Sequence, residues 1–243
     1  MISIYWKEIN AFFSSLIAYI AIGVFLVVMG VMLWFLPDFS LLEYNYATLA
    51  PFFDLAPVVF AFLIPAITMR SFSEERQSGT IELLATRPIS DLQIILGKYF
   101  AGLTLVLFAL IPTALYYVTV YQLGIPKGNL DSGAILGSYF GLFLLAGTFA
   151  SIGIFASSLS ANQIVAFLLA ILLCLTIHWG FFFFSKLPVF VGKLDDLIQQ
   201  LGIDYHYASI SRGVIDTRDL LYFLSTIAFF IALTLVSLER RKW

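Results

Sequence analysis

Long apolar runs separated by short polar segments set the pattern of this chain. Runs with few or no charges cover residues 16–36, 55–69, 94–121, 135–156, 164–184 and 220–238. A helix needs about 20 apolar residues to cross ~30 Å of hydrocarbon, a length that the second run reaches if it begins near Pro51. The pattern predicts an all-α polytopic membrane protein with six transmembrane helices, formed as a single transmembrane domain over residues 1–243.

The first 15 residues are amphipathic. At helical spacing, one side carries Ile4, Trp6, Ile9, Phe12 and Phe13, and the other carries Ser3, Lys7, Glu8 and Asn10. This pattern favours an interfacial helix, with the apolar side toward lipid and the polar side toward water. The alternative is a simple extension of the first span.

Charge is concentrated between the second and third spans, in residues 70–91. Ser71 stands three residues before Glu74, a capping-box spacing that predicts the start of a short helix, and Gly79 predicts its end. Thr80 begins a second short helix, which Pro88 ends. Ser90 followed by Gln93 repeats the capping box where the third span begins, and Lys98 is close enough to that start for its side chain to extend to water. Residues 70–91 therefore form either an anchor for their neighbours or a docking surface for a partner protein.

Three other segments carry local signals. Gly137 and Gly141 have the G-x-x-x-G spacing that lets another helix approach the fourth span closely. Prolines inside the second span predict a kink there. In residues 185–219, apolar side chains from Leu194 to Leu201 recur at helical spacing before Gly202. We expect that helix to lie on the outer membrane surface or to dip into it.

Composition supports the membrane assignment, and charge sets the orientation. The chain is 61% hydrophobic and 12% charged, against roughly a quarter charged residues in soluble domains. The loop after the first span has no Lys or Arg, whereas the next loop has Arg70, Arg76 and Arg87. The positive-inside rule then predicts that both termini are cytoplasmic, that residues 70–91 form a cytoplasmic loop and that residues 185–219 are extracytoplasmic.

The chemistry in the chain argues against an enzyme. Gly97-Lys98 lacks the spacing of a nucleotide-binding P-loop, and no metal-ligand or Ser/His/Asp pattern is visible. Cys174 lies in an apolar run, where a buried structural role is expected. His178 is the one candidate ionisable group near mid-membrane, and a satisfied interfacial histidine is the alternative. The spans carry no acid for a coupling ion, so a motor outside the chain must supply energy.

Residues 74–90, E-E-R-Q-S-G-T-I-E-L-L-A-T-R-P-I-S, resemble the first cytoplasmic loop of ABC-2-type exporter permeases. In that family an E-x-x-x-G-T-x-E-x-L-x-x-x-P pattern contacts the ATPase subunit. Within the family, the chain is most similar to the gliding motility-associated ABC transporter permease subunit. Similarity extends to residues 2–15, 62–75, 96–107 and 209–225, although only the loop motif is distinctive.

The resemblance implies a type V ABC exporter-like fold, with coupling helices in residues 70–91 and an interfacial helix beside the ATPase. The resemblance assigns contact with the ATPase to nine residues: Glu74, Glu75, Arg76, Gly79, Thr80, Glu82, Leu83, Leu84 and Pro88. Glu75 and Glu82 are expected to be exposed acids that meet basic groups on the ATPase.

The resemblance further implies an inner-membrane protein linked to bacterial gliding. This chain would bind no cofactor, and ATP and magnesium would belong to the ATPase. A second permease half, identical or not, and an auxiliary membrane protein with an extracytoplasmic domain would complete the complex. The alternative function is a membrane anchor or scaffold that transports nothing.

Overall fold

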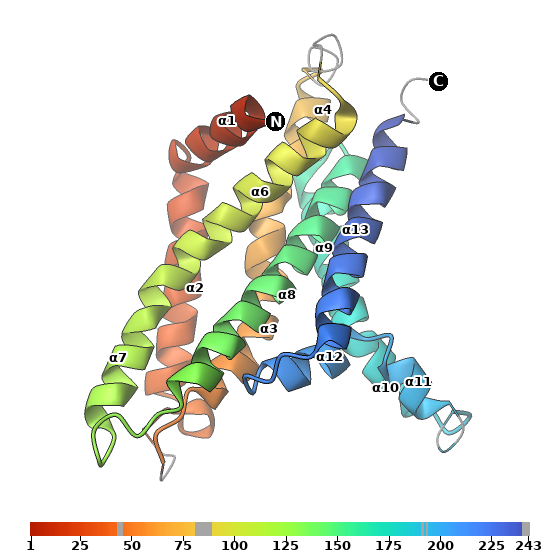
Figure 1. Cartoon of the computed structure of the whole chain (residues 1–243). Helices are drawn as coiled ribbons and strands as arrows, with labels where there is room; N and C mark the ends of the chain where they lie inside the picture. Colours follow the sequence, from red (N-terminus) through yellow and green to blue (C-terminus); the bar gives the residue numbers. More distant parts are fainter. Residues whose placement is uncertain (43–45, 81–88, 191, 193, 240–243) are drawn as a thin grey trace.

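The computed structural model describes residues 1–42, 46–80, 89–190, 192 and 194–239, and these residues form helices and connecting turns without strands (Figure 1). Five helical stretches are long and apolar enough to cross a membrane: Ala50–Gln77, Asp91–Leu123, Ser132–Leu159, Gln163–Ser185 and Thr217–Glu239. Helix α2 (Leu16–Trp34) adds a sixth when it is counted with α1 (Ile2–Phe13), from which it is bent by 69°. The predicted all-α membrane architecture is confirmed.

Several spans are interrupted. The second consists of α3 (Ala50–Thr68) and α4 (Arg70–Gln77), and the short helix η1 (Pro37–Phe39) precedes them. In the third, Pro112 lies in a 3-10 segment, η2 (Ile111–Thr113), between α6 (Asp91–Leu110) and α7 (Ala114–Leu123). The fifth consists of α9 (Gln163–Leu175), a π-helical segment η3 (Thr176–Gly180) and α10 (Phe181–Ser185). Proline explains the break in the third span, because it has no N–H to donate.

Helix α8 (Ser132–Leu159) is the most buried of the spans. It contacts α3, α4, α6, α9 and α12, together with the last helix, α13 (Thr217–Glu239) (Figure 1). Its small side chains permit this close approach of many neighbours, as expected for helices that associate without a hydrophobic driving force in lipid. The fourth span therefore organises the bundle.

The glycine face of α8 packs against the chain's own loop between the fifth and sixth spans. This loop holds α11 (Asp195–Gln199) and α12 (Ile203–Ile210), which lie on either side of the predicted stop at Gly202. A β-carbon at Gly141 would lie 1.9 Å from Ile210 Cγ2, and one at Gly137 would lie 2.8 Å from the Gly213 carbonyl oxygen. Both glycines thus make room for residues 210–213.

A proline in α3 explains how α12 is held. Pro57 cannot donate to the carbonyl of Phe53 one turn before it, which leaves that buried acceptor without its helical partner. The Tyr207 hydroxyl of α12 donates to this carbonyl at 2.9 Å. Ile203, Tyr207 and Ile210 are all buried, so α12 packs into the bundle.

Replacing Gly141 with Leu should displace α12, because the new side chain overlaps Ile210. Overpacking costs about 1–3 kcal/mol, so the opened population should rise by roughly tenfold. Limited trypsin digestion in detergent should show faster cleavage at Arg212, just after α12. Gly23→Leu is the matched control, since no described residue outside its own helix lies within 4 Å of a β-carbon there. Equal cleavage rates in the two variants would show that α12 does not depend on this contact.

Candidate functional site

Helix α4 is the described part of the candidate docking loop, and its start differs from the prediction. Ser71 does not cap it: α4 follows α3 after Met69, without a side-chain cap from its own segment. The Oγ of Ser157, on α8, instead accepts from the backbone N–H groups of Phe72 at 2.7 Å and Ser73 at 3.2 Å. The prediction failed because α3 runs almost directly into α4 and the acceptor comes from a distant helix.

The end of α4 matches the prediction. Gly79 has φ of +70°, the left-handed conformation that favours glycine. The Ser78 N–H donates to the Glu74 carbonyl at 3.0 Å, and the Gly79 N–H donates to the Arg76 carbonyl at 3.3 Å. Ser90 also caps α6 as predicted, accepting from the Gln93 N–H at 3.3 Å.

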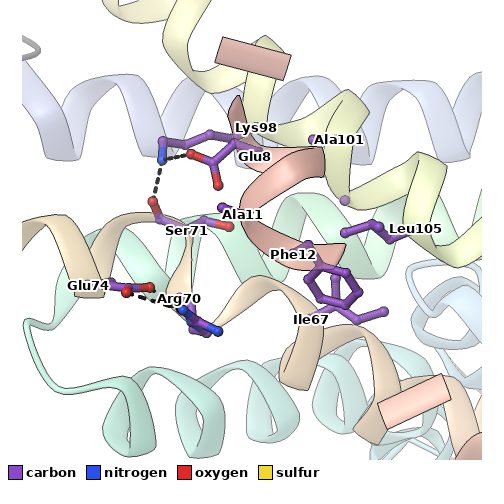
Figure 2. A pocket seen from close by; sticks show the side chains of 11 residues that line it. Glu8, Ala11, Phe12, Ile67, Arg70, Ser71, Glu74, Lys98, Ala101 and Leu105 are labelled. Atoms are coloured by element: carbon purple, nitrogen blue, oxygen red, sulfur yellow. Dashed lines mark hydrogen bonds and ion pairs between the residues drawn. The ribbon is translucent and has the colours of Figure 1, made fainter. Parts of the chain in front are cut away.

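Lys98, on α6, is the centre of the site. It is 2% exposed, and its Nζ donates to Glu8 Oε1 at 2.7 Å, Glu75 Oε1 at 2.9 Å and the Ser71 carbonyl at 2.5 Å. The ammonium also lies 5.0 Å from the centre of the Phe72 ring. Figure 2 shows the lysine reaching between α1 and α4 toward the glutamate and the carbonyl. All three of its donors are used, so the expectation that Lys98 extends to water is wrong.

A second lysine completes the arrangement. Lys7 Nζ lies 2.7 Å from Glu75 Oε1 and 3.3 Å from Glu8 Oε1. We call Lys7, Glu8, Glu75 and Lys98 the charge cluster. It has two charges of each sign and joins α1, α4 and α6. Among the described residues, Glu75 Oε2 is buried without a hydrogen-bond partner.

Burial and neighbouring charge have opposite effects on the pKa values of Lys7 and Glu8, the two residues of the cluster that lie on α1, before the first span. Burial acts to raise the pKa of the Glu8 carboxyl, but the charge of Lys98 and its hydrogen bond outweigh this and lower that pKa. Burial acts to lower the pKa of Lys7, but the hydrogen bond to Glu75 and the charge of Glu8 raise it. Both side chains are therefore held in their charged forms.

Helix α1 docks on α6 through apolar contacts as well. Ile4 and Ile9 are buried, and the Ile4 Cβ lies 3.1 Å from where a β-carbon of Gly97 would stand. Trp6 remains exposed. The expectation that both isoleucines face lipid is therefore wrong, because their side of α1 packs against the protein. Lys7 is exposed, as expected, and also pairs with Glu75 of α4. Glu8, expected to face water, is instead partly buried and binds Lys98 of α6.

A small cavity of about 60 Å³ lies beside the charge cluster, between α1, α4 and α6 (Figure 2). Arg70 lines it and is paired with Glu74 by two hydrogen bonds, from Nε at 2.9 Å and Nη2 at 3.2 Å. Arg70 Nη1 also donates to Ser15 Oγ at 2.9 Å, which ties α4 to the segment between α1 and α2. The cavity has room for a few water molecules beside polar groups.

The predicted docking residues fall into three groups. Glu74 on α4 and Gly79 and Thr80 just after it are exposed, and Arg76 is partly buried. Glu75 is 7% exposed and bound by two lysines of its own chain, so the prediction that it is an exposed acid is wrong. The expected second helix and the remaining residues lie outside the described residues: Glu82, Leu83, Leu84 and Pro88.

Sequence reasoning missed the pairing of Lys98, Glu8 and Ser157 with the loop. A signal was present for the lysine, which stands seven residues after Asp91 inside an otherwise apolar helix. The carboxylates that pair with Lys98 depend on how α1 folds back onto α6. The spacing of residues along the chain does not show this fold-back.

His178 occupies a different place in the fold, in η3. It is buried, its Nε2 lies 4.0 Å from Asp204 Oδ1 of α12, and its ring packs edge-on against Trp179. Burial raises the pKa of the Asp204 carboxyl. The histidine thus contributes to the seating of α12. Within the described ranges, no group of three His, Cys, Asp or Glu side chains is placed to hold a metal ion.

Comparison with known families gives one match. Residues 39–203, more than half of the chain, match the family described as "ABC-2 family transporter protein". A comparison with curated proteins found no match. The matched region includes α4 and Lys98, whereas α1 precedes it and α12 begins at its last residue.

Replacing Lys98 with Met should strongly destabilise the protein, because it leaves the buried Glu75 and the partly buried Glu8 with the half-exposed Lys7 as their remaining cationic partner. Removing one member of a buried ion pair costs about 3–5 kcal/mol, so unfolding in detergent should occur at a clearly lower temperature. Arg70→Met is the control, since its pair with the half-exposed Glu74 is worth about 1 kcal/mol or less. If both variants unfold at the same temperature, the charge cluster does not hold α1, α4 and α6 together.

Proposed function

The chain belongs to the ABC-2 family of transporter proteins and is a permease subunit of an ABC transporter, and we propose that it exports its substrate with energy delivered through α4. Family membership implies an ABC ATPase partner. ATP and magnesium would be bound by that partner, so the permease itself would be no enzyme. Mechanical force on the chain must then enter at a surface that is tied firmly to the spans.

The observation that supports this proposal is the set of contacts that α4 makes with other helices. Through Glu75 the helix reaches Lys98 of α6 and Lys7 of α1, and through its backbone it reaches Ser157 of α8. A displacement of the Gly79 turn would therefore be passed to three other helices at once. A loop that served only as an anchor would not need the buried pair of Glu75 and Lys98, which is costly to desolvate.

The face that bears α4 is proposed to be cytoplasmic. The argument rests on Arg70, Arg76 and Arg87 in one loop and on the absence of Lys and Arg from the loop after the first span. In that orientation both termini face the cytoplasm, in a bacterial inner membrane. Retention of an ATPase by this loop would support the same orientation, because ABC ATPases use cytoplasmic ATP.

The remaining parts of the complex are finer proposals. One chain of about six spans is half of the usual permease, so a second permease half is proposed, identical or not. A role in gliding, with an auxiliary membrane protein, rests on the similarity of residues 74–90 and the segments described above. Loss of surface gliding after deletion of the chain would support this role, and normal gliding after the deletion would rule it out.

Replacing Gly79 with Val should detach the ATPase while leaving the permease abundant and inserted. A β-branched residue at φ of +70° is strained by about 1–2 kcal/mol, which corresponds to roughly tenfold weaker docking if the turn shifts. Among the described residues, no atom beyond the neighbours of Gly79 in the chain lies within 4 Å of a β-carbon at this position, so the expected direct effect is backbone strain. Co-purification of the ATPase with the tagged permease measures the loss.

Gly79→Asn is the matched control, because asparagine tolerates the left-handed conformation. We expect it to retain the ATPase at close to the wild-type level. A Gly79→Val protein that keeps both its ATPase and its transport-dependent phenotype would favour the scaffold alternative instead.

A further inference from the structure

A lateral groove lies beside the break in the third span. It has a volume of about 510 Å³ and an almost entirely apolar lining. One wall consists of Leu107, Leu110, Ile111, Ala114 and Tyr117 from α6, η2 and α7. The other wall consists of Ser132, Ile135, Leu136, Tyr139 and Phe143 from α8. Each set recurs at helical spacing, so the groove follows one face of each helix.

The dimensions of the groove restrict what fits it. From Ser132 to Phe143 it follows α8 for 11 residues, which is about 16 Å at 1.5 Å per residue. This is about half of the ~30 Å hydrocarbon core, or one leaflet. Dividing the volume by this length gives a mean cross-section of about 30 Å², which is that of a circle about 6 Å across and so narrower than a helix of 10–12 Å diameter. A single extended hydrocarbon chain is the occupant of matching shape.

The polar groups of the groove lie where a lipid would need them. The Tyr117 hydroxyl and Ser132 Oγ are 2.8 Å apart, at the first residue of α8, and form a polar rim. Deeper along α8, Tyr139 is paired with Thr113 at 3.2 Å, which leaves the rest of the wall apolar. Ile111 and Leu136 are 64% and 71% exposed, so the groove opens sideways onto the surface that faces lipid.

We propose that this groove binds one acyl chain of a membrane phospholipid, in the leaflet opposite the charge cluster, with the ester region of the lipid at the Tyr117–Ser132 rim. The break at Pro112 creates the space, because the third span does not continue as a regular α-helix there. The bound lipid then fills the contact between α7 and α8. The site does not depend on ATPase docking, and its test leaves the coupling loop unchanged.

Native mass spectrometry of the purified full-length chain in detergent, titrated with palmitoyl-oleoyl phosphatidylethanolamine, tests the proposal. The wild-type chain should retain one tightly bound lipid. Ala114→Trp places a bulky ring inside the groove and should lower the fraction with this lipid at least tenfold. Leu115→Trp is the matched control, because Leu115 is 66% exposed on the same helix and does not line the groove. It should bind the lipid like the wild type.

Equal lipid retention by both variants would overturn the proposal, and so would equal loss. A change of oligomeric state in Ala114→Trp with lipid binding intact would also overturn it, by showing that a protein helix covers the groove. Should Ala114→Trp not assemble, Ala114→Phe fills the same space with less volume, and the same outcomes decide.

Discussion

A buried ammonium group at Lys98 is the constraint on which the end of the bundle that bears α1 and α4 depends. A lysine inside an apolar bundle is tolerated only when opposite charge and hydrogen-bond acceptors surround it. Glu8 and Glu75 supply the charge and Ser71 supplies a carbonyl, and these residues come from α1 and α4. The positions of α1 and of α4 are therefore fixed by one side chain of α6.

Backbone groups that lack a partner within their own helix likewise determine which helices pack together elsewhere in the molecule. Pro57 leaves the Phe53 carbonyl without its helical donor, and Tyr207 of α12 fills that position. At the start of α4, the Ser157 hydroxyl serves two N–H groups. In an apolar environment each such group has few partners to choose from, so each contact specifies which helices pack together.

The sequence was sufficient for the features that depend on local chemistry. The apolar runs located the spans, Gly79 marked the end of α4, and Ser90 marked the start of α6. Features that depend on distant partners were not predictable. Lys98 was expected to reach water and Glu75 to face a partner, because nothing in their spacing shows that α1 folds back beside them. Likewise, Gly141 signalled close packing correctly, but the sequence did not show that Ile210 is its neighbour.

The central claim is that α1, α4 and α6 move as one unit when the ATPase works. The most direct measurement locks α1 to α6 with a disulfide in an Ile4→Cys, Gly97→Cys chain. Ile4 Cβ lies 3.1 Å from the β-carbon position of residue 97, and disulfides join β-carbons about 3.5–4.5 Å apart, so a small shift suffices. The account predicts that ATP turnover by the assembled complex is the same in the oxidised and reduced forms. Turnover that stops on oxidation and returns with reductant would contradict it, by showing that the two helices must separate.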